Sequence, residues 1–203
     1  LSLILAGTLA MPALAATWSA VDRTPTVGKQ ILSKNNLPST TKFVVTETAV
    51  TNSTSNTNDE IYVQKTDLGY TGNDNEVAAV IAQEIGVIIN ANASKKKLVS
   101  NITSAIAGNF VDTNLENTAL VANELTLNNM SAKDQMNADI TGVDLMITAG
   151  YNPLAMVVWV TKQPGGYLEA LKGEPANSKR AMNIYDYLTY NYPSKVKAGY
   201  ACN

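Results

Sequence analysis

The stretch "AVIAQEIGVIINA", residues 79–91, is rich in apolar residues. Apolar residues in and just before it cover most of the helical wheel over 75–93. A helix that is apolar nearly all round belongs in the centre of a domain, buried by its neighbours. Asn73, followed three residues later by Glu76, resembles a helix N-cap with its reciprocal glutamate. We therefore predict a central buried helix over 75–93, interrupted by the polar pair Gln83–Glu84.

The sequence on either side of this helix predicts a helix-rich α+β domain. Residues 42–50 and 60–66 contain many β-branched side chains and are joined by a polar segment, so they indicate two strands of a small antiparallel sheet. Gly150 suits the position that ends a helix, and Pro153 suits the start of the next. Further helices are predicted over residues 27–34, 97–108, 114–128, 131–149, 153–163 and 177–190.

The first part of the chain predicts export. Residues 1–16, "LSLILAGTLAMPALAA", form an apolar run that ends in an A-x-A pattern at Ala13 and Ala15. This pattern is typical of a secretory signal peptide cut near Ala15 or Ala16, and an uncleaved N-terminal anchor is the alternative. We expect a single domain over 17–203, exported to the periplasm or the extracellular space and without membrane contact after cleavage.

The composition excludes several kinds of site. The chain has no histidine, which removes Ser-His-Asp triads, Cys-His pairs and every histidine-ligated metal centre. Its one cysteine, Cys202, has no partner for an internal disulfide. The net charge is -2 and the lysines are scattered, apart from the run 95–97, so we expect no nucleic-acid partner.

The frame Gln83–Val87 has the spacing of the H-E-x-x-H zinc motif without its histidines. Residues four apart project from the same face of a helix, which is how two histidines grip one zinc ion. The glutamate beside the first histidine then acts on the zinc-bound water as general base. Glu84 stands at that glutamate, whereas an amide and an apolar side chain stand at the two histidines.

Two longer stretches extend this similarity to a family. "NEVAAVIAQEIGVIINANAS" resembles the D-E-L-A-A-V-L-A-H-E-I-G-H helix of the zinc metalloendopeptidases that include the HtpX-like and BepA-like enzymes, the CAAX prenyl proteases and the Oma-type peptidases. "QMNADITGVDLMITAGYNPLAM" resembles the family's E-x-E-A-D-x-x-G-x-x-L-x-x-x-A-G-Y-x-P-x-A segment. "EIYVQKTDL" is similar to its edge strand, and "NYPS" to its T-H-P-S segment. The resemblance implies a zincin-like (gluzincin) domain with a central active-site-type helix.

The resemblance also implies where the family's zinc ligands would lie. Its two histidine ligands correspond to Gln83 and Val87, and its third ligand, the first glutamate of E-x-E-A-D, corresponds to Gln135. A glutamine oxygen is a weak, neutral ligand for zinc, and valine has no donor atom. We therefore expect no zinc and no other cofactor, although the family uses zinc.

Three further family positions keep a polar side chain. The general base corresponds to Glu84, the motif aspartate to Asp139 and the histidine of T-H-P-S to Tyr192. Without zinc, we expect Glu84 to hydrogen-bond a nearby glutamine or a backbone group and Asp139 to brace a helix. A hard cation held by the oxygens of these carboxylates and of the two glutamines is the alternative.

The function predicted from these residues is that of an exported pseudopeptidase. It would bind extended peptides or a protein partner along the edge strand, near residues 62–64, by backbone hydrogen bonds that need no metal. Two other functions stay open at this point. One is an active hydrolase with an altered site that uses Glu84, and the other is a structural interaction domain.

Overall fold

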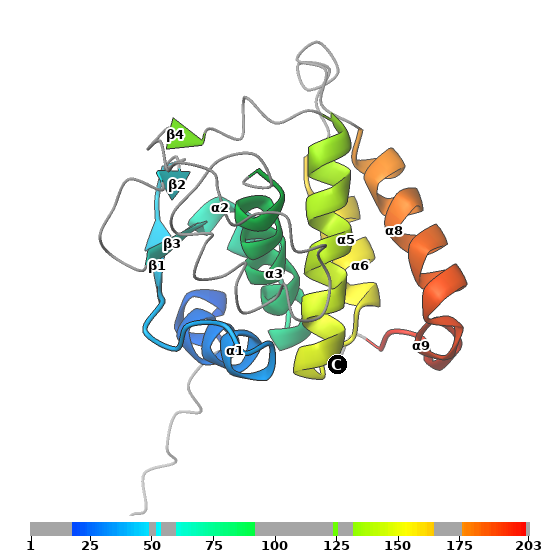
Figure 1. Ribbon diagram of the computed structural model, residues 1–203, viewed down its shortest axis with the longest axis horizontal. Coiled ribbons are helices and arrows are strands. Elements are labelled where there is room, and N and C mark those ends of the chain that lie inside the picture. The colour runs from blue at the N-terminus through cyan, green and yellow to red at the C-terminus, as the bar shows by residue number, and fades with distance from the viewer. Residues whose placement is uncertain are drawn as a thin grey trace, which may run out of the picture.

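A computed structural model describes residues 18–48, 52–53, 60–91, 124–125, 132–164 and 176–201. These residues form a helix-rich α+β fold, as predicted (Figure 1). Its helices are α1 (Ala20–Lys34), α2 (Lys65–Leu68), α3 (Asp74–Ala91), α5 (Ala132–Ala149), α6 (Leu154–Lys162), α8 (Asn177–Asn191) and α9 (Pro193–Ala198). Its strands are β1 (Lys42–Thr46), β2 (Asn52–Ser53), β3 (Glu60–Gln64) and β4 (Glu124–Leu125).

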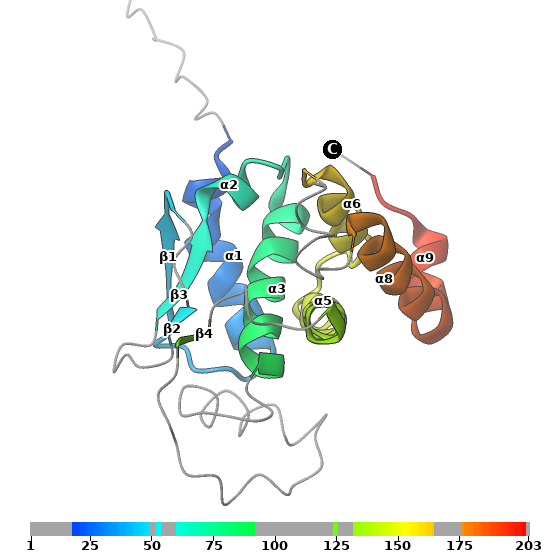
Figure 2. The same cartoon turned by 90° about the horizontal axis from the view of Figure 1, so that it is seen from above.

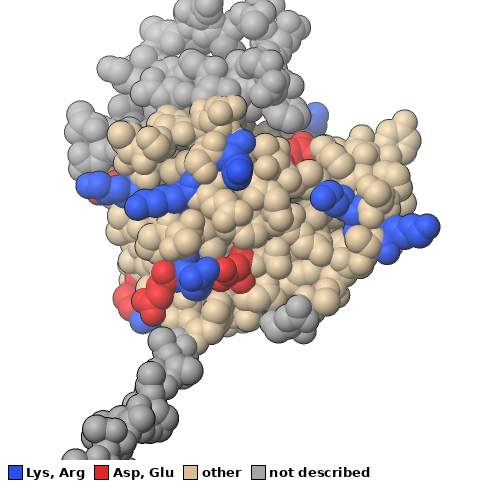
Figure 3. Space-filling model, turned by 90° about the horizontal axis from the view of Figure 1, so that it is seen from below, with Lys and Arg blue, Asp and Glu red and all other residues tan. Residues whose placement is uncertain are grey.

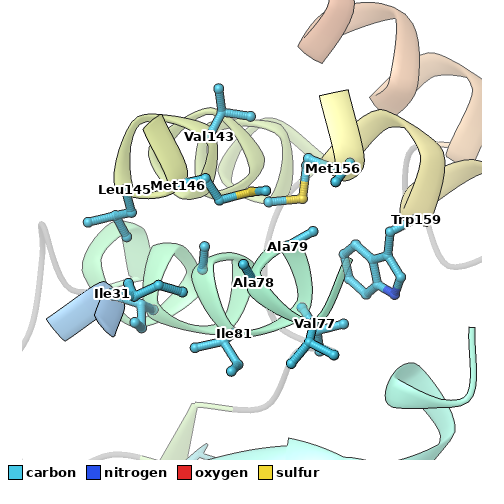
Figure 4. Packing of buried hydrophobic residues seen from close by; sticks show 14 of the residues in the cluster. Ile31, Val77, Ala78, Ala79, Ile81, Val143, Leu145, Met146, Met156 and Trp159 are labelled. Atoms are coloured by element: carbon cyan, nitrogen blue, oxygen red, sulfur yellow. The ribbon is translucent and has the colours of Figure 1, made fainter. Parts of the chain in front are cut away.

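Helix α3 lies at the centre of the fold, as the apolar run over residues 79–91 predicts. Strands β1 and β3 lie on one side of it and helices α5, α6 and α8 on the other (Figures 1 and 2). Every residue from Glu76 to Ile88 is buried, because helices α1, α5 and α6 and strand β3 all pack against α3. The apolar side chains of α3 meet those of α5 and α6, among them Met146, Met156 and Trp159 (Figure 4).

Local signals set the ends of two helices. The Oδ1 of Asn73 accepts hydrogen bonds from the backbone N–H of Asn75 at 3.0 Å and of Glu76 at 3.1 Å, which caps α3. Glu76 does reach back over this end, but its Oε2 accepts from the N–H of Gly72, one residue before the predicted partner. Helix α5 ends at the predicted Gly150, which has a φ of 85° that favours glycine.

The small sheet differs from the prediction. Strands β1 and β3 pair in parallel, from Lys42 opposite Glu60 to Thr46 opposite Gln64, and not as an antiparallel hairpin. A parallel pair requires a crossover of about a dozen residues or more. Residues 47–59 are long enough for that crossover. The polar composition of this segment therefore did not require a hairpin. The antiparallel pair in the described residues is the short one between β2 and β4.

The structure agrees with some of the other predicted helices and differs at others. The predicted helices 131–149, 153–163 and 177–190 correspond to α5, α6 and α8. The helix predicted over 27–34 begins earlier, at Ala20, because the Oγ of Ser19 accepts from the N–H of Asp22 at 3.3 Å. The helix predicted over 97–108 lies outside the described residues, as does the one over 114–128 apart from β4, which is a strand.

The export prediction rests on residues that the structure does not describe, because 1–16 fall outside the described ranges. Within the ranges that are described, none of the helices combines the length and the apolar character that crossing a bilayer requires.

Candidate functional site

Two glycines bring the helices of the candidate site into backbone contact. A Cβ added at Gly86 of α3 would lie 2.2 Å from the backbone oxygen of Ala138 of α5. A Cβ added at Gly142 of α5 would lie 3.0 Å from the backbone oxygen of Ala82 of α3. The two contacts pair a later residue of one helix with an earlier residue of the other, so α3 and α5 run antiparallel. The residues next to these two contacts on α3 therefore lie close to the residues next to them on α5.

The three residues that the resemblance matched to zinc ligands lie on these two helices. Gln83 and Val87 are buried on α3, and Gln135 is half-buried on α5. Their donor atoms do not fit zinc, since two are neutral amides and valine offers none. In the described part of the chain, no three His, Cys, Asp or Glu side chains come close enough together to hold a metal ion. The hard-cation alternative lacks such a cluster of carboxylates there.

Glu84, which the resemblance matched to the family's general base, lies inside the protein. Its exposed fraction is 4%, and it has a polar or electrostatic partner. A general base must reach the proton that it removes, directly or through one water. A carboxylate so enclosed on α3 suits a structural role better than catalysis on a substrate from solvent.

Asp139 forms the most buried ion pair that the structure describes. Its side chain is fully buried, and it binds Arg180 of α8 through both oxygens: Nε donates to Oδ2 at 2.8 Å and Nη2 donates to Oδ1 at 2.7 Å. The Arg180 Nη1 also donates to the Oε1 of Gln163 at 3.3 Å. Asp139 of α5 is therefore joined to α8 by this ion pair.

Sequence reasoning missed Arg180, although a signal was present. The apolar stripe of α8 includes Ile184 and Leu188, both fully buried, and Arg180 stands four residues before Ile184 on the same face. An arginine on such a stripe is carried into the interior, where it requires an anionic partner. Asp139, an unexplained carboxylate in an apolar helix segment, was the partner to seek.

The positive charge of Arg180 also affects a carboxyl group that directly follows β3. Burial raises the pKa of Asp67, which lies in α2 directly after β3, and the positive charge of Arg180 opposes this rise. The backbone oxygen of Asp67 accepts a hydrogen bond from the indole N–H of Trp159 at 3.2 Å. Asp67 of α2, Asp139 of α5 and Gln163, directly after α6, thus all interact with the guanidinium of Arg180.

Tyr192 belongs to a different cluster. Its hydroxyl donates to Asp144 Oδ1 at 3.0 Å, and the Tyr187 hydroxyl donates to the same carboxylate at 2.8 Å. Burial raises the pKa of Asp144, and the two tyrosine hydrogen bonds oppose this rise. Tyr192, which lies outside the residues that were predicted to be close to Asp139, therefore helps to join α8 and α9 to α5.

Glu76, which the sequence placed at the cap of the central helix, makes further contacts that the sequence did not predict. Its exposed fraction is 1%, and it accepts hydrogen bonds from Lys162 Nζ through both oxygens, at 2.8 and 2.7 Å. The Tyr200 hydroxyl donates to its Oε1 at 3.0 Å. Because these partners come from α6 and from the segment after α9, Glu76 ties the start of α3 to the C-terminal part of the fold.

Comparison with known proteins gives one match. The sequence profile described as peptidase family M48 matches residues 22–187, which is most of the chain and includes α3 and α5. No curated protein and no solved structure matches the chain.

Proposed function

The chain belongs to peptidase family M48, and from this premise we propose that it is an exported pseudopeptidase that binds extended polypeptide without zinc-dependent cleavage. One observation carries the proposal. The carboxylate of Asp139 is bound on both oxygens by Arg180, while the three former ligand positions hold two amides and a valine. The scaffold of the family is therefore retained around a centre whose donor atoms do not suit zinc.

The burial of Glu84 favours binding over an altered hydrolase. A hydrolase without a metal would need this carboxylate to act on a water beside the substrate. At 4% exposure, Glu84 is enclosed by the packing of α3 against its neighbours. Its retention is explained more simply by a satisfied interior position.

The element that would receive a peptide is β3. Ile61 and Val63 point into the core, whereas Glu60, Tyr62 and Gln64 are half-buried and alternate with them. Among the described strands, β3 pairs with β1 alone. An added peptide strand gains affinity from main-chain hydrogen bonds and needs no metal. On the face shown in Figure 3, Lys and Arg side chains are interspersed with Asp and Glu, which gives no support to a polyanionic partner.

The proposal is tested on the purified full chain by three measurements. Zinc content by elemental mass spectrometry, cleavage of fluorescent casein with and without a chelator, and binding of labelled β-casein by fluorescence anisotropy are recorded together. We expect no stoichiometric zinc, no cleavage and saturable binding. Zinc in a ratio near one, with cleavage that the chelator abolishes, would overturn the proposal.

Two variants separate the other functions. Glu84→Gln keeps the shape of the side chain and removes its charge, so it should leave β-casein binding unchanged if the chain is a binder. Turnover in the native chain that this variant loses would establish the altered hydrolase instead. A correctly folded chain that binds no β-casein at any concentration would leave the structural interaction domain as the remaining function.

A further inference from the structure

Helix α8 buries one face against α5 and α6 and exposes the opposite face (Figures 1 and 2). Three of the five large apolar or aromatic side chains that the described residues leave exposed lie on this one helix. They are Met182, Tyr185 and Tyr190, with exposed fractions of 66%, 46% and 88%. Isolated exposed apolar residues are ordinary, whereas several on one face indicate a surface that contacts another molecule. Methionine and tyrosine are also enriched where proteins bind one another.

Two opposite charges flank the apolar centre of this face. Lys179 stands three residues before Met182 and Asp186 stands four residues after it, and all three are exposed. Helix positions three, four and seven apart lie on one side, so the lysine and the aspartate are about two turns apart with Met182 between them. Within the part of the chain that the structure describes, neither of these two charges belongs to an ion pair.

The order of these charges makes the face complementary to itself. A two-fold axis uses the same surface on both copies, so that residue i contacts residue j and j contacts i. When two α8 helices lie antiparallel with Met182 near the axis, Lys179 of each copy meets Asp186 of the other. A parallel arrangement would place lysine against lysine and aspartate against aspartate, and such like-charge contacts are unfavourable.

We propose that the outer face of α8 binds a second copy of this chain, with the two α8 helices antiparallel. Met182 and Tyr185 form the apolar centre of the contact, and Lys179 and Asp186 form two equivalent ion pairs at its rim. Helix α8 has 15 residues and is therefore about 22 Å long, so the contact is small. Small interfaces belong to weak or transient complexes, and we expect a dimer that forms at micromolar concentration and above.

The dimer would carry two copies of the strand that is proposed to bind polypeptide. Strand β3 lies on the opposite side of α3 from α8, so a contact through α8 does not include β3 (Figure 2). This consequence rests on the proposed function: if β3 receives polypeptide, one long unfolded chain can occupy both copies. The second binding event then takes place at a raised effective concentration. The dimer itself does not depend on that function.

Sedimentation equilibrium of the purified full chain over a series of concentrations tests the dimer without any ligand. We expect the average mass to rise from that of a monomer toward that of a dimer. Lys179→Glu and Asp186→Lys should each lower the association constant by about tenfold or more, because each reversal makes both ion pairs repulsive. The matched control is Lys29→Glu, which reverses an exposed charge on α1, at the other side of the fold, and should leave association unchanged (Figure 1).

Mixing the two charge-reversal variants gives the most specific outcome. In a mixed dimer, the two carboxylates of the Lys179→Glu chain face the two amines of the Asp186→Lys chain, so both ion pairs are attractive again. The mixture should therefore form a heterodimer at concentrations where each variant alone is a monomer. The double variant that carries both reversals should dimerise as the native chain does. A mixture that stays monomeric, or single variants that associate as tightly as the native chain, would overturn the antiparallel contact.

Met182→Asp tests the centre of the contact. It places two like charges beside the axis and should abolish the dimer, while the 66% exposure of Met182 means that folding, followed by circular dichroism, should not change. A native chain that stays monomeric at the highest concentration would overturn the proposal. Binding of that monomer to phosphatidylglycerol vesicles, lost in Met182→Asp, would assign the face to a lipid surface instead.

These outcomes are distinguishable from failure of the proposed function, because dimerisation and β-casein binding are measured separately. A dimer that binds no β-casein would overturn the proposed function and leave the dimer standing. A monomer that binds β-casein would do the reverse.

Discussion

Replacing Gly86 by alanine tests whether the contact between α3 and α5 is as close as the structure places it. The new Cβ would lie 2.2 Å from the backbone oxygen of Ala138, whereas Cβ contacts below 3.0 Å are essentially never found. The two helices would have to separate by at least about 0.8 Å at this point, because the atom in the way is backbone and has no rotamer to change.

The magnitude follows from two opposed effects. Overpacking a well-filled interior costs about 1–3 kcal/mol, and a rigid backbone contact puts Gly86 at the upper end. Alanine in place of glycine within a helix returns about 1 kcal/mol through backbone entropy. We therefore expect Gly86→Ala to lower the free energy of unfolding by about 2 kcal/mol.

Urea denaturation followed by circular dichroism measures this loss. The control is Gly72→Ala, where the nearest atom to an added Cβ is the Glu76 Oε2 at the ordinary distance of 3.7 Å. That variant should change the free energy of unfolding by less than about 0.5 kcal/mol. A stabilised Gly86→Ala chain would show that helix propensity outweighs packing here, and the close approach of α3 to α5 would be refuted.

Three further predictions address the metal and the buried carboxylates. Incubation with a zinc chelator should leave the melting temperature unchanged if no zinc is bound. A zinc ion present at about 100 times its dissociation constant would stabilise the fold by about 2.7 kcal/mol, and the chelator would remove that stabilisation. A drop in melting temperature would therefore contradict the prediction. The raised pKa of Asp144 means that its stabilising contribution is complete below pH 3.8 and is lost as pH rises through the higher pKa of the folded state. Denaturation at a series of pH values should therefore show Asp144→Asn gaining stability relative to the native chain as pH increases above 3.8, and parallel curves would exclude this titration. Finally, Glu76→Gln should lower the free energy of unfolding in urea by about 1.5–3 kcal/mol, because it weakens charged hydrogen bonds inside the protein. Glu47→Gln, at an exposed ion pair, should lower it by no more than about 1 kcal/mol. Equal losses would show that burial of Glu76 is not what makes its contacts strong.

The sequence predicted the central helix because its signals agreed with one another. The apolar run, the cap at Asn73 and the stop at Gly150 on the partner helix all depend on contacts within a few residues of the chain. Such local preferences act before any tertiary contact is formed, so they can be read without knowing the fold. The family resemblance placed α3 and α5 in the same way, through residues that pack the two helices together.

The orientation of the sheet was not predictable in this way. A parallel and an antiparallel pair bury the same alternating side chains of β1 and β3, so the pattern at Ile61 and Val63 does not distinguish them. Strand direction depends on the path of the chain through residues 47–59, and the polar composition of that segment suits a turn and a crossover alike.

Arg180 is a residue of the candidate site that the comparison of motifs did not predict. A motif names the residues that a reaction needs, and it is silent about the partners that its charged residues find elsewhere in the chain. Asp139 is buried, and the requirement of a buried carboxylate for a cation does not fix where in the chain that cation comes from. Here it comes from α8, 41 residues away in sequence. The partners of buried charged residues on α3 and α5 are therefore best sought among all the helices that pack against these two, and not in the two motif segments alone.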